Sequence, residues 1–124
     1  MFADTKALGA FAVDDLAKAR KFYGETLAIR VSERHGLLTL HLAGGGDIRV
    51  YPKPGHVPAA YTILMFQVDD VEAAVGELAG RGVRFERYDG MEQDERGIAR
   101  GGGPFIAAWF KDPAGNLLEV LQER

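Results

Sequence analysis

The stretch FAVDDLAKARKFY, residues 11–23, returns in similar form 55 positions later as FQVDDVEAAVGEL, residues 66–78. In both stretches an apolar run leads into Val-Asp-Asp, and apolar side chains then recur at helical spacing. A short aspartate side chain can accept hydrogen bonds from the free N–H groups at a helix start. Each Val-Asp-Asp therefore predicts a strand followed by a helix, and the shared order of elements indicates an internal repeat.

More strands are predicted after each helix. Alternating or continuous apolar runs place strands at 6–13, 29–33, 37–43 and 47–52 in the first copy, and at 61–68, 83–88, 105–111 and 116–122 in the second. In the first copy, apolar side chains recur at helical spacing from Leu16 to Leu27. In the second copy, Gly80 or Gly82 is expected to end the helix. Asp112 to Asn116 predicts a turn between the last two strands.

We therefore expect an α+β fold made of two β-α-β-β-β modules in one domain, residues 1–124. Module one covers about 5–52 and module two about 59–124, joined by the proline-containing connection 53–58. A chain of 124 residues is the usual size for one domain, and its 47% apolar composition is enough for a core.

Composition excludes several kinds of function. The net charge of −3 argues against a nucleic-acid partner, which would require a basic surface. The absence of cysteine excludes disulfides, thiolate metal sites and cysteine nucleophiles. Met1 to Lys6 has no apolar run, and Ala59 to Phe66 is far shorter than the ~20 residues that span a bilayer. We expect a cytoplasmic protein without a membrane partner.

Two motifs carry a resemblance to a known family. Asp-Leu-x-x-Ala-x-x-Phe-Tyr occurs at 15–23 and Phe-x-Asp-Pro-x-Gly-Asn-x-x-Glu at 110–119. With the repeated order of elements, they resemble the vicinal oxygen chelate superfamily, which includes glyoxalase I, bleomycin resistance proteins, fosfomycin resistance proteins and extradiol dioxygenases. The resemblance implies mixed sheets curled into a half-open cup with the helices outside, a small-molecule partner in the cup and a homodimer.

The same resemblance implies where a divalent metal would bind in the enzymes of the superfamily. The first-strand ligands correspond to positions near Leu8 and Ile63, and the last-strand ligands to Arg49 and Glu119. Only Glu119 has a metal-binding side chain, and a positive charge at Arg49 opposes a cation. We therefore expect no metal ligand set and no cofactor, with a divalent metal kept as the alternative.

Arg49 and Glu119 are the main candidates for ligand binding. Strand alternation places Glu119 on one face with Leu117 and Leu121, and an isolated buried carboxylate is costly. One hypothesis is that Arg49 and Glu119 face each other in the cup, as a structural pair or an anchor for a ligand carboxylate or enolate. The alternative is that both face solvent at strand edges.

Further candidates follow from the same alternation. Met65 and Gln67 share one face of their strand, His41 lies opposite a wholly apolar face, and Tyr51 shares a face with Arg49. His41 is either a satisfied surface residue or a histidine of the site. Trp109 either packs in the core or stacks against a flat ligand.

Two other features leave their roles open. The segment 90–103 is long, charged and rich in glycine, including Gly101 to Gly103, and is either a surface loop or a lid. No nucleophile constellation is recognisable, because Ser32 is the only serine and no partner can be placed beside it.

Three functions are compatible with these observations. The first is a metal-free protein that binds a small organic molecule, similar to the bleomycin resistance branch. The second is a divalent-metal-dependent lyase, isomerase or dioxygenase of the same superfamily, with Glu119 as base or ligand. The third is a structural or regulatory domain. Loss of ligand positions favours the first, and retention of Glu119 favours the second.

Overall fold

The computed structural model describes residues 1–101 and 103–124, so Gly102 of the glycine run lies outside the described residues. The chain divides into two compact units, Met1–Val57 and Pro58–Arg124. The division falls within the connection 53–58 that the sequence places between the modules. Each unit is described by itself.

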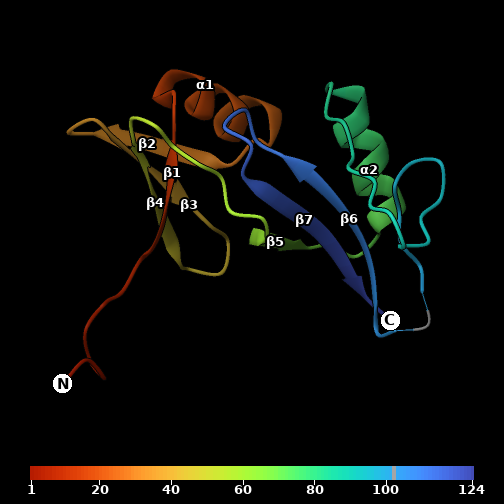
Figure 1. Ribbon diagram of the computed structural model, residues 1–124. Helices are drawn as coiled ribbons and strands as arrows, with labels where there is room; N and C mark the ends of the chain where they lie inside the picture. Colours follow the sequence, from red (N-terminus) through yellow and green to blue (C-terminus); the bar gives the residue numbers. More distant parts are fainter. Residues whose placement is uncertain (102) are drawn as a thin grey trace. The chain divides into compact units, whose positions relative to one another are not determined.

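The first unit is a four-stranded mixed sheet with one helical segment (Figure 1). Its elements are β1 (Gly9–Val13), α1 (Leu16–Lys21), the π-helical turn η1 (Phe22–Thr26), β2 (Arg30–Arg34), β3 (Leu37–His41) and β4 (Asp47–Pro52). The strand order is β1-β4-β3-β2, with β1 parallel to β4 and the other pairs antiparallel. β2 and β3 form a hairpin whose two turn residues, His35 and Gly36, both have positive φ, as a tight turn between twisted strands requires.

The helical segment begins and ends at identifiable residues. Asp15 has extended backbone, and its side chain accepts a hydrogen bond of 3.1 Å from the N–H of Lys18, as expected for an N-cap. The α-helix then widens, and Leu27 N–H donates to the carbonyl of Phe22, five residues earlier. Ala28 ends the segment with φ of 55°, a conformation that glycine usually supplies.

One face of this sheet is packed against the helical segment. Leu38, Leu40 and Val50 are fully buried on that face, together with Val13 and Tyr23. The Tyr23 ring lies 5.7 Å from that of Phe11, which joins the helical segment to β1. Successive side chains alternate across a strand, so the residues between these core positions lie on the opposite face of the sheet.

The second unit is a three-stranded sheet with one helix. Its elements are β5 (Thr62–Gln67), α2 (Val71–Gly80), β6 (Phe105–Lys111) and β7 (Leu117–Glu123), in the order β5-β7-β6. β7 is the central strand, parallel to β5 and antiparallel to β6. Val71, Val75, Phe110, Leu118 and Val120 are buried between the sheet and α2, which lies along β6 and β7 in Figure 1.

Helix α2 repeats the capping found in the first unit. The Asp70 side chain accepts a 3.1 Å hydrogen bond from the N–H of Ala73, and Glu72 stands in the first turn. Gly82, with φ of 91°, follows the end of the helix. Among residues 1–101 and 103–124, no helix is long and apolar enough to cross a membrane.

The predicted fold class is confirmed, but one predicted strand is wrong. Residues 83–88 form only an isolated bridge between Phe85 and Phe110, with a 2.7 Å bond from Glu86 N–H to the Trp109 carbonyl. The reason is that the Gln93 side chain accepts from the N–H of Tyr88 and donates to the Glu86 carbonyl, so side-chain bonds replace the ladder.

Other boundaries differ slightly from those predicted. The predicted helix to Leu27 is interrupted by η1, and the first strand begins at Gly9, where pairing with Ile48 begins. β7 begins after Asn116 because both the backbone N–H and the side chain of Asn116 bond to the Asp112 carboxylate. The predicted turn at 112–116 is confirmed, and Gly115 there has φ of 86°.

Ala28 generates a testable prediction about stability. An alanine at positive φ is strained, and Ala28 is exposed, so no burial is lost when its side chain is removed. We expect Ala28→Gly to raise the free energy of unfolding by about 0.5–1 kcal/mol, measured by urea denaturation.

Ala60→Gly is the matched control, because Ala60 is exposed and its φ is not positive. Gly there only adds freedom to the unfolded chain, so this variant should be neutral or slightly less stable. Equal changes in both variants would show that the positive φ of Ala28 carries no strain.

Candidate functional site

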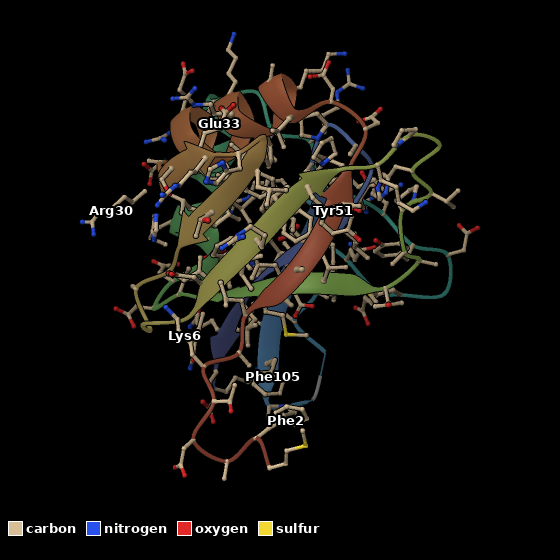
Figure 2. All side chains as sticks on the ribbon, turned by 90° about the vertical axis from the view of Figure 1, so that its left-hand side faces the viewer. Phe2, Lys6, Arg30, Glu33, Tyr51 and Phe105 are labelled. Carbon is tan, nitrogen blue, oxygen red and sulfur yellow. The ribbon has the colours of Figure 1, made fainter. Side chains whose placement is uncertain are left out.

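The candidate residues of the first unit gather on the face of the sheet that α1 leaves uncovered. Strand pairing places Ser32 beside Thr39 and Thr39 beside Arg49 in one row across β2, β3 and β4. His41 pairs with Asp47 in the next row. Figure 2 turns this sheet toward the viewer, with Tyr51 on it and Arg30 extending outward from β2. We call this surface the Arg49 face.

Arg49 lies on the inner strand β4 and is half-buried, not at a sheet edge. Its Nε is buried and has no hydrogen-bond partner among the described residues. A buried N–H without an acceptor is costly, and a guanidinium has four further N–H donors in a planar fork. Arg49 is thus a cation with one buried donor that has no acceptor among the described residues, and its planar guanidinium suits a planar anionic group.

His41 is held between two partners on the Arg49 face. Its Nε2 lies 2.8 Å from Ser32 Oγ, and its Nδ1 lies 3.3 Å from Asp47 Oδ1. Sequence reasoning proposed His41 but found no partner for Ser32, and the structure supplies one. The sequence feature that could have revealed this contact is the two-residue turn at His35 and Gly36, because such a turn determines which residues of β2 and β3 lie side by side.

In the second unit, Glu119 occupies the middle of the face that α2 leaves uncovered, on the central strand. Its Oε1 accepts a 2.9 Å hydrogen bond from Trp109 Nε1 and a 3.2 Å bond from Thr62 Oγ1. Within 58–101 and 103–124, Oε2 accepts no hydrogen bond. One oxygen anchors the carboxylate and the other remains available to a ligand, a proton or water.

Aromatic and apolar side chains surround Glu119. Met65 pairs with Glu119 across β5 and β7, is 59% exposed, and shares this face with Gln67. The Tyr88 ring stands edge-on to the half-buried Trp109 ring at 5.9 Å. Burial, and then the charge of Glu86, raise the pKa of Tyr88, so its hydroxyl remains a neutral donor at physiological pH. We call this surface the Glu119 face.

A bulge in β5 brings Thr62 to Glu119. Thr62 pairs with Leu117 and Leu64 pairs with Leu118, so Ile63 is an extra residue in β5. Strict alternation from Met65 would assign Thr62 to the opposite face. Sequence reasoning missed the contact for that reason, since nothing in the apolar run marks the bulge.

The donor set does not fit the metal centre that the superfamily resemblance implies. Leu8 precedes β1, Ile63 is the bulged residue of β5, and Arg49 is a cation, which leaves Glu119 alone. Within 1–101 and 103–124, no group of three or more His, Asp and Glu side chains is placed to hold a metal ion. Arg49 and Glu119 belong to different units, so their pairing stays a hypothesis.

The segment after residue 90 is tied to its surroundings. Ile98 is buried, Ala99 bridges to Ala107, and Arg100 contacts both Asp94 and Glu72, the latter at 2.5 Å. The N–H groups of Arg96 and Ile98 donate to Asp94 Oδ1. Residues 93–100 therefore form a folded loop packed beside α2 and β6.

The shape of the surface alone does not locate the site. A hollow of about 600 Å³ lies between α1, η1 and β2, and its lining includes Arg20, Lys21, Glu25 and Glu33. It contains the Arg20–Glu33 ion pair of 3.2 Å, in which both side chains are well exposed. The hollow is lined by these charged side chains and by uncharged ones (Ala17, Gly24, Ile29 and Val31), whereas the buried Nε without a partner lies on the Arg49 face.

Comparison with known proteins gives the class to which this chain belongs. The family model described as the Glyoxalase/Bleomycin resistance protein/Dioxygenase superfamily matches residues 8–120. This chain belongs to that superfamily. None of the curated proteins matches it significantly.

Solved structures agree on the fold. A glyoxalase family protein from Bacillus anthracis is 19% identical, with 100% of both chains covered and a TM-score of 0.72. The fosfomycin resistance protein FosX from Listeria monocytogenes is 16% identical, with 98% of this chain and 94% of that one covered and a TM-score of 0.73. TnmS3, an antibiotic binding protein from Streptomyces sp. CB03234, is 25% identical, with 98% of both chains covered and a TM-score of 0.66.

The loop generates a prediction about acid stability. Burial by itself would raise the pKa of Asp94, but hydrogen bonds from Arg100, Ile98 and Arg96 and the Arg100 charge lower it to about 2, from an ordinary 3.8. A lowered folded-state pKa contributes stability above about pH 4 that is lost as the pH falls toward 2. We expect Asp94→Asn to be less stable at pH 7 and to lose less stability between pH 4 and 2, by urea denaturation at each pH.

Asp89→Asn is the control, because Asp89 is an exposed aspartate just before the same loop. The change in its free energy of unfolding with pH should parallel that of the unmodified protein. An Asp94→Asn curve parallel to that of the unmodified protein would contradict the role assigned to this carboxylate.

Proposed function

We propose that this protein binds a small organic molecule that carries an acidic group, a carboxylate or an enolate, and that it does so without a catalytic metal. The observation that carries the proposal is the buried Nε of Arg49, which has no hydrogen-bond partner among the described residues. A ligand anion supplies the missing acceptor, and charge-assisted bonds to a guanidinium are among the stronger polar contacts.

The surroundings of Arg49 suit such a ligand. Thr39 and Tyr51 lie on the same face, and the Tyr51 side chain is 38% exposed, so hydroxyl groups are available to orient a bound molecule. The Glu119 face offers the exposed Met65 and the half-buried Trp109 ring as apolar surface. Within the first unit, the Tyr51 ring on the same face as the guanidinium favours a planar ligand.

The comparison with TnmS3 supports a binding role. That protein is described as antibiotic-binding, it is 25% identical to this chain, and the match covers 98% of both. The donor set points the same way, because three of the four positions that resemble metal ligands lack a metal-binding side chain. Both observations support a binding role for this chain within the superfamily.

Calorimetry with one acidic probe tests the proposal. Anthraquinone-2-carboxylate is a planar molecule with one carboxylate, and its carboxamide is the neutral counterpart. We expect Arg49→Met to weaken binding of the acid about 10- to 100-fold, since hydrogen bonds to charged groups are worth about 1.5–3 kcal/mol. Binding of the carboxamide should change far less.

Arg30→Met is the matched control, because Arg30 is an exposed arginine on the same sheet. It should bind both probes as the unmodified protein does. Equal affinity of Arg49→Met for the acid would refute the anchoring role.

A second candidate is the metal-dependent lyase, isomerase or dioxygenase, and one observation favours it. Glu119 Oε2 accepts no hydrogen bond within the described part of its unit, so this carboxylate keeps one oxygen for a metal or a substrate proton. Its Oε1 is already held by Trp109 and Thr62, which would orient the group.

Metal content separates the two candidates. After incubation with nickel, zinc, manganese and iron(II) and then desalting, elemental analysis should find well below one metal ion per chain. Near-stoichiometric metal that is lost in Glu119→Gln would overturn the metal-free proposal and favour the metal-dependent candidate.

A further inference from the structure

Ser32, His41 and Asp47 form a continuous hydrogen-bonded chain across three strands. Ser32 Oγ lies 2.8 Å from His41 Nε2, and His41 Nδ1 lies 3.3 Å from Asp47 Oδ1. The Asp47 carboxylate also lies 4.0 Å from Lys6 Nζ. Hydroxyl, imidazole and carboxylate thus follow one another in the order that activates a serine in hydrolases.

The carboxylate dictates the state of the imidazole. A carboxylate only accepts, so neutral His41 carries its proton on Nδ1 and directs it to Asp47. Nε2 is then an unprotonated acceptor, and the Ser32 hydroxyl donates to it. This is the tautomer in which an imidazole can take the hydroxyl proton during attack.

The sheet holds the three groups in place. His41 pairs with Arg30 on one side and with Asp47 on the other, and Ser32 follows Arg30 by two residues on the same face. Backbone ladders on both sides of β3 therefore set the spacing. Ser32 is exposed, so a substrate can reach its Oγ, whereas the His41 and Asp47 side chains are only 34% and 25% exposed.

Arg49 lies on the same face as Ser32 and would select a substrate with an acidic group. Ser32, Thr39 and Arg49 lie in one row across β2, β3 and β4. Neighbouring strands are about 4.8 Å apart, so the Cα atoms of Ser32 and Arg49 are separated by about 10 Å. That span suits a short acyl chain with its carbonyl carbon at Ser32 and a terminal carboxylate at the guanidinium.

We propose that Ser32 is a nucleophile for acyl transfer from small activated esters, with His41 as general base and acid. Ser32 Oγ bonds to the acyl carbon while its proton passes to His41 Nε2. The bond from the acyl carbon to the leaving oxygen then breaks. A departing alkoxide takes the proton from His41, whereas a phenoxide leaves as the anion and His41 releases its proton to solvent. Water then attacks the acyl-serine and gives a proton to neutral His41, which passes it to Ser32 Oγ as the acid is released, and the Ser32 hydroxyl is restored.

Asp47 is a positioning residue in this scheme, because it orients His41 and does not touch the substrate. Preference for an acidic acyl chain rests on the proposed function of Arg49, whereas the nucleophilic role of Ser32 does not. The two parts are therefore tested with different substrates.

The first test uses p-nitrophenyl acetate and the full chain. We expect release of p-nitrophenolate and an acetyl group on Ser32 in the peptide mass spectrum after a brief reaction and acid quench. Ser32→Ala and His41→Gln should lower the enzyme-dependent rate about 100-fold. Asp47→Asn should lower kcat about 10-fold and shift the pH at which kcat is half-maximal. A smaller folded fraction would lower kcat by the same factor at every pH and would leave that midpoint unchanged.

His35→Asn is the matched control. His35 is exposed in the turn beside Ser32 with φ of 55°, a conformation that asparagine tolerates. This variant should keep the full rate. A rate in Ser32→Ala equal to that of the unmodified protein, or acetyl groups found only on lysines or His41, would overturn the assignment of Ser32.

The second test compares p-nitrophenyl acetate with the mono-p-nitrophenyl ester of glutaric acid. The acidic ester should show the higher kcat/KM, and the ratio of the two values should fall to about one in Arg49→Met. A ratio near one in the unmodified protein, with Ser32 acetylation still present, would refute the preference for an acidic substrate and would still support Ser32 as the nucleophile. If Ser32 is not acetylated but anthraquinone-2-carboxylate still binds in an Arg49-dependent way, the nucleophilic role of Ser32 is refuted and the proposed binding function is not.

Discussion

Each sheet of this protein is covered by its own helix on one face only, and strand alternation decides what is left on the other. In the first unit Leu38, Leu40 and Val50 are buried toward the helical segment, and Thr39, His41 and Arg49 are thereby directed to the opposite face. In the second unit, Leu118 and Val120 are buried against α2, so Glu119 between them lies on the opposite face of that sheet. The hydrophobic core therefore determines which side chains lie on the other face of each sheet, because the side chains of a strand point alternately to only two faces.

The two faces satisfy their polar groups to different degrees. Glu119 is anchored through one oxygen by Trp109 and Thr62, while the buried Nε of Arg49 has no partner among the described residues. His41 is fully engaged, with one ring nitrogen toward Ser32 and the other toward Asp47. Unsatisfied groups carry an energetic cost in the free protein, and a bound molecule that supplies their partners removes that cost. The binding proposed at Arg49 thus depends on a group that the fold leaves without a partner among the described residues, whereas the reactivity proposed at Ser32 depends on contacts that the fold completes.

Membership of the glyoxalase, bleomycin resistance and dioxygenase superfamily defines the scaffold and leaves the chemistry to individual side chains. The positions that resemble metal ligands illustrate this. Leu8 and Ile63 cannot bind a cation, Arg49 opposes one, and Glu119 remains. The same scaffold can therefore present a carboxylate, a guanidinium or a hydroxyl–imidazole pair on its open faces. Which of these groups acts depends on what each one contacts.

The sequence by itself determined the repeated modules, the two aspartate-capped helices, the turn at Asp112 to Asn116 and the shared face of Arg49 and Tyr51, since these depend on neighbours close in the chain. Tertiary structure decided the rest. The strand expected at 83–88 was replaced by bonds from Gln93, the bulge at Ile63 turned Thr62 toward Glu119, and strand pairing brought Asp47 and Ser32 to His41. Such contacts join residues whose side chains meet only after strands pair, so local patterns of hydrophobicity do not predict them.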